Sequence, residues 1–203
     1  MTMRKKIGIL GGTFNPIHIG HLLLAQYAFE QAELAKIIFI PSGVSYMKQD
    51  IPILPAKDRM RLVELSIQYH SCFEVSDMEI LRPGNTYTYE TLEELKRKQD
   101  NHYYFILGAD SVFSMEKWKE PARIFKSCTI LAAVRETTDK ERLRIKTEDL
   151  KQKFGADIML LDFPRIDISS SEIRERLKLG KSIHHMVAPE AEEYIYKNQL
   201  FKR

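Results

Sequence analysis

A short apolar run that ends in two glycines and leads into two histidines constrains the fold of this chain more than any other feature. Residues Ile7 to Leu10 have the composition of a buried strand, and residues Leu22 to Ala32 have the apolar spacing of a helix. The connection between them, residues 11–21, reads GGTFNPIHIGH. Such a turn leaves the first N–H groups of the helix unpaired, with a partial positive charge of about half a unit, so phosphates bind there.

Apolar runs alternate with helical segments along the whole chain. This alternation predicts an α/β fold: a Rossmann-like parallel sheet with flanking helices and a small C-terminal helical part. We expect one domain over residues 1–203, a length that suffices to bury a substantial core. The expected strands are residues 7–10, 37–40, 73–75, 103–107, 129–134 and 158–161. The expected helices are residues 22–32, 58–69, 89–98, 121–125, 140–154, 171–179 and 189–197.

The turn after the first strand has the residue types of a phosphate site. His18 and His21 lie three residues apart, so their rings share one side of the helix start and could bind one phosphoryl group together. Gly11, Gly12 and Gly20 let the backbone approach a ligand. The histidines could instead be a fragment of a zinc site, but zinc needs three or four ligands, and the six His and two Cys of the chain are scattered. The glycines fit neither the dinucleotide fingerprint nor the Walker loop.

A second block, Ile168-Ser169-Ser170-Ser171-Glu172-Ile173-Arg174, opens a later helix. Ser169 and Glu172 have the spacing of a capping box, which by itself is only structural. The adjacent hydroxyls and the Arg174 guanidinium are more than a cap requires, and together with the free N–H groups they form a second anion site. In a parallel sheet both blocks would lie at the carboxyl ends of strands and face one crevice.

These blocks carry a resemblance to a known family. The string GGTFNPIHIGH resembles the T/H-x-G-H signature of the nucleotidyltransferase superfamily, whose members transfer a nucleotidyl group from a nucleoside triphosphate without a covalent enzyme intermediate. The block ISSSEIR is similar to the superfamily motif I-S-S-T-x-I-R, with Ser171 in place of the usual threonine. The segments 85–92, 105–111, 187–189 and 194–195, together with Trp118, resemble the bacterial nicotinate-nucleotide adenylyltransferases, and the resemblance spans nearly the whole chain.

The resemblance implies an activity. A cytoplasmic enzyme of NAD biosynthesis would transfer AMP from ATP to nicotinate mononucleotide, giving deamido-NAD and pyrophosphate. Mg²⁺ would accompany ATP and be held mostly by phosphate and water, with no ligand from the protein. Pantetheine-phosphate adenylyltransferases and other nucleotidyltransferases share the first motif and are the alternative. A nucleotide-binding regulator without turnover is a further alternative.

The resemblance also assigns residues. His18, His21 and Arg174 are expected to be catalytic. The residues expected to bind ATP are Gly11, Gly12, Thr13, Phe14, His18, Gly20, His21, Gly108, Asp110, Ile168, Ser169, Ser170 and Arg174. The residues expected to bind nicotinate mononucleotide are Asn15, Lys48, Thr88 and Trp118. Asp110 could instead cap a helix, and Trp118 could be a buried structural residue.

Two positions depart from the family pattern. After the second strand the family carries P-S/N-x-x-P-P-H-K, whereas residues 41–48 read PSGVSYMK, so Lys48 is kept and the histidine is lost. Contacts from the middle of that loop are therefore not carried over. Asn15 stands where aspartate is commoner, a change that removes a charge but keeps hydrogen bonding.

Charge and cysteine content restrict the partners. A net charge of +3 with interleaved acids and bases argues against a surface for nucleic acid. The basic N-terminus is followed by only four apolar residues, a strand rather than a signal peptide, and no apolar run is long enough to span a membrane. Cys72 and Cys128 are expected to be reduced thiols in the core. The sequence leaves a homo-oligomer open.

Overall fold

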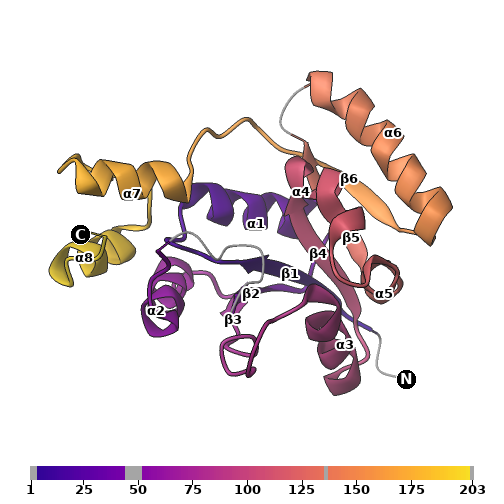
Figure 1. Cartoon of the computed structure of the whole chain (residues 1–203), viewed down its shortest axis with the longest axis horizontal. Helices are drawn as coiled ribbons and strands as arrows, with labels where there is room; N and C mark the ends of the chain where they lie inside the picture. The colour runs from indigo at the N-terminus through magenta and orange to yellow at the C-terminus, as the bar shows by residue number, and fades with distance from the viewer. Residues whose placement is uncertain (1–3, 44–51, 135–136, 202–203) are drawn as a thin grey trace.

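A six-stranded sheet forms the centre of the protein (Figure 1). The computed structural model describes residues 4–43, 52–134 and 137–201. All strand pairs are parallel, and the strand order is β3-β2-β1-β4-β5-β6. The strands are β1 (Lys6–Gly12), β2 (Lys36–Pro41), β3 (Phe73–Val75), β4 (His102–Gly108), β5 (Thr129–Val134) and β6 (Ile158–Asp162).

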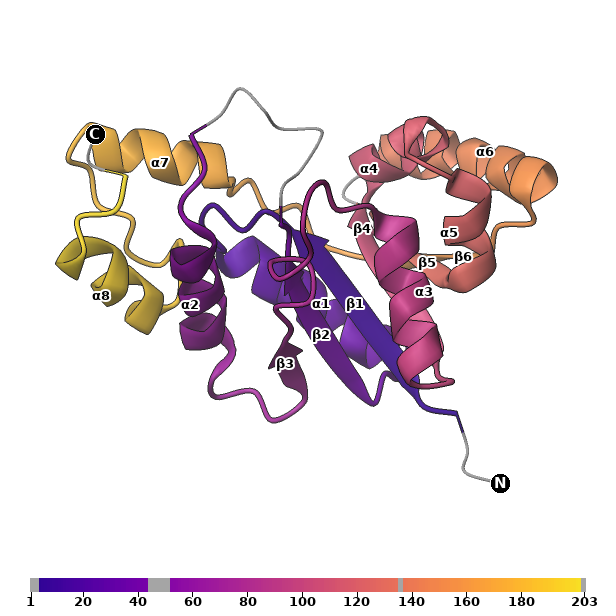
Figure 2. The same ribbon diagram turned by 60° about the horizontal axis from the view of Figure 1, so that its bottom comes forward.

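Helices cover both faces of the sheet, as Figures 1 and 2 show from two directions. The helices are α1 (Ile19–Gln31), α2 (Ala56–Ile67), α3 (Thr88–Lys98), α4 (Ala109–Ser114), α5 (Pro121–Ser127), α6 (Thr137–Phe154), α7 (Ser170–Lys178) and α8 (Pro189–Lys197), with a 3₁₀ turn η1 at Met115–Lys117. The chain reverses its direction across the sheet between β1 and β4, so these neighbouring strands form the topological switch point of the fold.

The sheet separates two apolar cores. Successive side chains of a strand point to opposite faces, so Leu10 and Ile106 contribute to the core under α1, α2, α7 and α8. Ile9 and Phe105 contribute to the core under α3, α4, α5 and α6. Because both faces are covered, the strands read as continuous apolar runs rather than as alternating patterns.

The sequence expectations for the strands are confirmed within one or two residues, and the fold class is confirmed. Each predicted helix is present, with ends shifted by up to three residues. Helix α4 and turn η1 were not predicted, because six and three residues are too short for a helical period to show. Both cysteines are free, and burial raises the pKa of the Cys128 thiol to about 12.

The C-terminal helical part packs against the first half of the chain. Helix α8 lies beside α2, and the Tyr194 hydroxyl donates to the Asp58 carboxylate at 2.9 Å. Burial and the neighbouring Asp58 raise the pKa of Tyr194. Within the described ranges, no helix combines the length and the apolarity that crossing a membrane requires.

Candidate active site

A cleft of about 440 Å³ opens where β1 and β4 end. This is the switch point of the sheet, where ligands of open α/β folds bind. Ten of the residues assigned from sequence line it: Gly11, Gly12, Thr13, Phe14, Asn15, His21, Gly108, Asp110, Ser170 and Arg174. The turn after β1 and the start of α7 therefore meet at one site, as the sequence predicted, and the start of α4 joins them there.

The two histidines form the start of α1. His18 is the N-cap, and its backbone N–H donates to Nδ1 of His21 at 3.2 Å. The two rings lie 3.7 Å apart between centroids, and the rings of Phe14 and His21 form a T-shaped pair with their centroids 5.2 Å apart. Because Nδ1 of His21 accepts a hydrogen bond, the neutral ring carries its proton on Nε2. His21 is thus held in the tautomer that can donate to an anion in the cleft.

A smaller pocket of about 220 Å³ adjoins the cleft and shares His21, Gly108 and Ser170 with it. It is lined by the remaining residues assigned to ATP, namely His18, Gly20, Ile168 and Ser169. A Cβ added at Gly20 would lie 3.0 Å from Nδ1 of His18. Glycine at this position therefore leaves room for the His18 ring, a more specific reason than the access for ligand that the sequence suggested.

The start of α7 is bonded directly to the turn after β1. Ser169 is the N-cap, and its Oγ accepts from the N–H of Glu172 at 3.1 Å, which confirms the predicted cap. Ser170 Oγ donates to the carbonyl of Pro16 at 2.8 Å, and Arg174 Nη1 donates to the carbonyl of Asn15 at 2.8 Å. A guanidinium has five N–H donors, so Arg174 can hold the turn and still offer donors to an anion.

Asp110 lies in the first turn of α4, exposed, with Gly108 as the N-cap of that helix. The alternative that Asp110 itself caps the helix is therefore wrong. Its carboxylate lines the cleft beside Gly108. This position suits a contact with a ribose, because the ribose hydroxyls can donate hydrogen bonds to a carboxylate.

The residues assigned to the mononucleotide are less concentrated. The buried Asn15 amide donates to Pro52 O at 3.0 Å and accepts from Leu54 N at 3.0 Å, so it holds the chain before α2. Thr88 begins α3, and the half-buried Trp118 forms a T-shaped pair with Phe105, with the ring centroids 6.3 Å apart. Neither Thr88 nor Trp118 is among the described residues that line the cleft. Lys48 and the altered loop around it lie outside the described residues.

Sequence reasoning missed Arg59, which is buried with 3% of its surface exposed. Its guanidinium donates to three carbonyl oxygens: Thr13 O at 2.9 Å, Ser42 O at 2.7 Å and Leu54 O at 3.1 Å. Burial lowers the pKa of Arg59. A sequence signal did exist, because Arg59 falls on the buried stripe of α2 together with Leu62, Val63 and Ser66.

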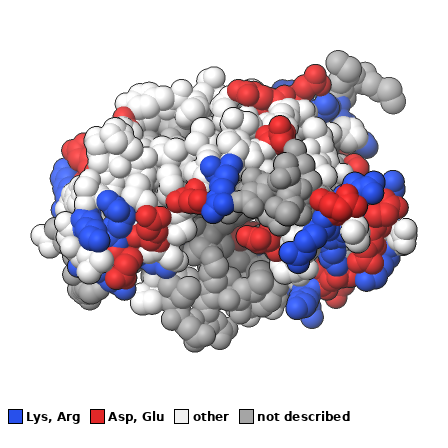
Figure 3. Space-filling view, turned by 90° about the horizontal axis from the view of Figure 1, so that it is seen from above, with Lys and Arg blue, Asp and Glu red and all other residues white. Residues whose placement is uncertain are grey.

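Charges of both signs intermix on the face shown in Figure 3. They are dense at the right of that view, where α6 lies, and there Lys146 and Lys153 pair with Glu116 and Asp149. The partners hold the pKa of Glu116 and of Asp149 below the usual range. These charges therefore neutralise one another locally, as the interleaved sequence predicted.

Fold and cleft together define an α/β protein in which two helix starts meet at the switch point of a parallel sheet, an arrangement typical of nucleotide-binding proteins. The cytidylyltransferase-like family model matches residues 9–176. A probable nicotinate-nucleotide adenylyltransferase of Lachnoclostridium phytofermentans is 42% identical over 198 residues, 97% of this chain and 99% of that protein. One of Clostridium beijerinckii is 38% identical over 98% of this chain and 100% of its own length.

Solved structures agree on the fold. The nicotinic acid mononucleotide adenylyltransferase of Plasmodium falciparum superposes with a TM-score of 0.79 at 23% identity, over 97% of each chain. The protein therefore belongs to the cytidylyltransferase-like family and, within it, to the nicotinate-nucleotide adenylyltransferases.

Arg59 provides a test of how the site is held. We expect Arg59→Ala to lower the free energy of unfolding by about 3 kcal/mol, because hydrogen bonds from a charged group contribute ~1.5–3 kcal/mol each and part of that sum offsets the desolvation of the cation. Urea denaturation measures the change. The matched control is Arg61→Ala on the same helix, whose half-exposed side chain pairs with Glu64 and should contribute under about 0.5 kcal/mol. Equal effects of the two substitutions would contradict the structural role of Arg59.

Proposed function

We propose that the protein transfers the adenylyl group of ATP to nicotinate mononucleotide, giving deamido-NAD and pyrophosphate. The observation that carries the proposal is the meeting of the His21 turn and the Ser170–Arg174 helix start in one cleft at the switch point of the sheet. The names of the relatives support it. So do two solved structures of the Plasmodium falciparum enzyme, described as complexed with NaAD and with APC.

The chemistry needs positioning rather than a base. The attacking oxygen belongs to a phosphate of the mononucleotide, which is already an anion, so no proton has to be removed before it attacks the α-phosphorus in line. The bond from that phosphorus to the bridging oxygen breaks, and pyrophosphate leaves with the electron pair. Charge accumulates on the equatorial and leaving oxygens, and preorganised donors stabilise it.

The proposed donors are the groups that the cleft brings together. His21 would donate from Nε2 to the reacting phosphate at the start of α1, with the His18 ring tilted against it at 3.7 Å between centroids. Ser169, Ser170 and Arg174 at the start of α7 would hold the β- and γ-phosphates. Asp110 would bind the ribose, and Gly11, Gly12, Thr13, Phe14, Gly20, Gly108 and Ile168 would form the wall against which ATP lies.

A divalent ion, which we propose is Mg²⁺, would arrive with the triphosphate. Among the described residues that line the cleft, Asp110 is the only carboxylate, and no group of three or more metal-ligating side chains occurs in the described parts of the chain. Such a site fits an ion held mainly by phosphate oxygens and water. Bound there, the ion would offset charge on the phosphates.

The acceptor would be held on the other side by Asn15, Lys48, Thr88 and Trp118. Thr88, at the first turn of α3, would meet the nicotinate carboxylate, and the Trp118 indole would stack on the pyridine ring. We further propose that residues 1–203 act as one nucleotidyltransferase domain, since α8 packs on α2 and α7 is bonded to the turn after β1.

A panel of acceptors tests the proposed function. With ATP present, we expect nicotinate mononucleotide to release pyrophosphate and to be strongly preferred over its amide, because donors aimed at a carboxylate are poorly matched by a carboxamide. The measurement is kcat/KM for nicotinate mononucleotide, nicotinamide mononucleotide and phosphopantetheine. Preference for phosphopantetheine would favour the alternative transferase, and no turnover with any acceptor would favour a binding protein.

His21→Ala tests the donor in the cleft. We expect kcat to fall about a hundred-fold with ATP binding and folding kept, since one preorganised donor to developing charge contributes ~3 kcal/mol. The control is His102→Ala, an exposed histidine at the first residue of β4 and so at the opposite end of that strand. Near-normal turnover of a folded His21 variant would exclude the role.

Trp118→Ala separates stacking from packing. If the indole stacks on the pyridine ring, the KM for nicotinate mononucleotide should rise about ten-fold or more while the KM for ATP stays unchanged, since base–aromatic stacking contributes ~1–3 kcal/mol. Steady-state kinetics and thermal unfolding are measured together. A lowered Tm with both KM values unchanged would instead make Trp118 a structural residue that packs on Phe105.

A further inference from the structure

One peptide group beside the cleft is held at both of its ends by ionisable side chains. The Ser42 carbonyl accepts from Arg59 Nη2 at 2.7 Å, and the N–H of the same peptide group, on Gly43, donates to the Glu79 carboxylate. The segment reaches the cleft directly, since the N–H of Ser42 donates to the carbonyl of Gly12 at 2.8 Å. The peptide plane between Ser42 and Gly43 is thus fixed where β2 ends.

The charges match the dipole of that peptide group. A peptide carries partial negative charge on its oxygen and partial positive charge on its N–H, so a cation at the oxygen and an anion at the N–H both favour the observed orientation. The reverse orientation would direct the carbonyl at a carboxylate and the N–H at a guanidinium. Arg59 and Glu79 therefore specify one peptide orientation and penalise the flipped one.

Only glycine fits at position 43. A Cβ added there would lie 2.2 Å from the carbonyl oxygen of Glu79 and 2.9 Å from Cγ2 of Thr86. The backbone of residue 43 thus packs directly on the segment that leads to α3. This close approach is what brings the Gly43 N–H within reach of the carboxylate.

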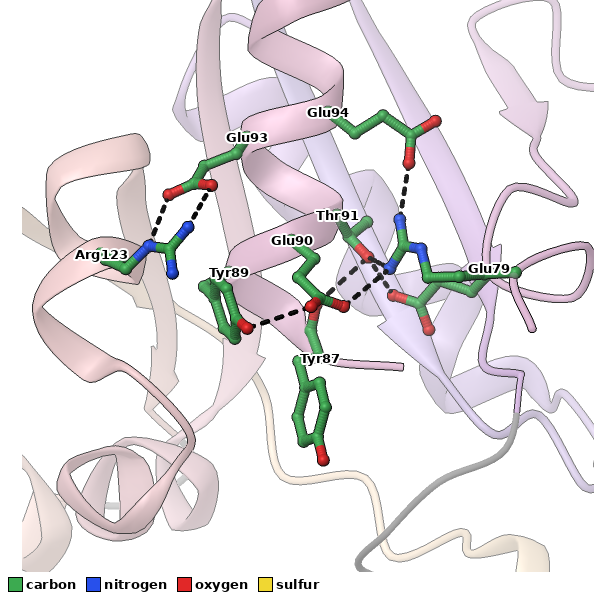
Figure 4. A network of polar contacts seen from close by, with 9 residues as sticks. Glu79, Tyr87, Tyr89, Glu90, Thr91, Glu93, Glu94 and Arg123 are labelled. Carbon is green, nitrogen blue, oxygen red and sulfur yellow. Dashed lines mark hydrogen bonds and ion pairs between the residues drawn. The ribbon is translucent and has the colours of Figure 1, made fainter. Parts of the chain in front are cut away.

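Glu79 also binds the start of α3. Its Oε1 accepts from Thr91 Oγ1 at 2.8 Å, and the hydroxyl of Thr86 also donates to the carboxylate. Thr91 in turn accepts from Arg82 Nη1 at 2.9 Å. Figure 4 shows Glu79 and Thr91 facing each other, with Glu94 on the same side of the helix and the Glu93–Arg123 pair on the opposite side.

Thr86 and Thr91 are buried and flank Thr88, the residue assigned to the nicotinate carboxylate.

We propose that Glu79 is a positioning residue for the acceptor half of the site, because its carboxylate joins the Ser42–Gly43 peptide to the α3 start that carries Thr88. This inference rests on the proposed function. It assigns Glu79 no contact with substrate: the carboxylate acts through Gly43, Thr86 and Thr91. The start of α7, which would hold the β- and γ-phosphates, is fixed by other contacts, namely the bonds of Ser170 and Arg174 to the turn after β1.

The carboxylate is costly to bury. Burial raises the pKa of Glu79, although the hydroxyls of Thr91 and Thr86, the Arg82 charge and the Gly43 N–H act in the opposite direction. A neutral amide of the same shape would avoid that desolvation. Glu79→Gln is therefore expected to fold with an unchanged or higher Tm, which makes it a usable second variant.

The experiment compares Glu79→Ala, Glu79→Gln and Glu93→Ala in steady-state assays with ATP and nicotinate mononucleotide. We expect Glu79→Ala to raise the KM for the mononucleotide about ten-fold, with the KM for ATP unchanged, because the Gly43 N–H and two hydroxyls lose their shared acceptor. Glu79→Gln should raise the same KM by a smaller factor, since an amide offers one acceptor oxygen where the carboxylate offers two. Calorimetric titration of nicotinate mononucleotide should reproduce the order.

Glu93→Ala is the matched control. Glu93 also carries a carboxylate, which forms an ion pair with Arg123 at 2.6 Å on the opposite side of α3. In the described structure Glu93 does not contact Gly43 or Thr86. Its removal should leave both KM values unchanged.

Two results would overturn the inference. The first is a folded Glu79→Ala variant whose KM for the mononucleotide is unchanged. The second is that, in both Glu79→Ala and Glu79→Gln, the KM for ATP rises by the same factor as the KM for the mononucleotide. If Glu79→Ala does not fold, Glu79→Gln decides, and an unchanged mononucleotide KM there refutes the proposal. Wild-type turnover is measured first. An inactive wild type refutes the proposed function itself, whereas an active wild type with indifferent Glu79 variants refutes only this inference.

Discussion

The site depends on one buried cation. Arg59 donates to carbonyls from three separate segments: the turn after β1, the end of β2 and the residues directly before α2. Each carbonyl lies beyond the regular pairing of its strand or helix, so without Arg59 it would need another donor or water. A single guanidinium meets all three because its donors are fixed in a plane. The cleft floor at Thr13 and the β2 edge at Ser42 are therefore held by the same group.

Preorganisation explains why two helix starts meet. Residues at the starts of α1 and α7 line the same cleft, where each helix end carries partial positive charge. If these two ends became ordered only when a ligand bound, the entropic cost would weaken the affinity. Ser170 and Arg174 prevent this by donating to the Pro16 and Asn15 carbonyls, which lie more than 150 residues away in sequence. The Asn15 carbonyl also offsets part of the positive charge of Arg174. Arg174 is thus both part of the scaffold and part of the proposed phosphate site.

The sequence predicted what local patterns encode. The strands followed from apolar runs, and the roles of His18 and Ser169 at helix starts followed from residue type and spacing, which the structure confirms. Glu79 and Arg59 could not be placed, because their roles depend on which distant backbone groups lie beside them. Helix α4 was not predicted because its six residues make fewer than two turns, and the placement of Asp110 inside a helix was missed for the same reason. Contacts of Lys48, Thr88 and Trp118 with a mononucleotide stay predictions.

The two charged groups at the Ser42–Gly43 peptide also show how a site of this kind affects stability. Burial lowers the pKa of Arg59 and raises that of Glu79, so for both groups folding disfavours the charged form. For a carboxyl whose folded pKa is raised, the stabilising contribution is complete below the unfolded pKa and is lost as pH rises through the folded pKa. At a pH above its folded pKa, the ionised Glu79 therefore diminishes the stability of the fold, while Arg59 stays charged because its intrinsic pKa is so high. Glu79 is therefore better explained by the orientation that it imposes on the Ser42–Gly43 backbone beside the cleft than by a contribution to folding.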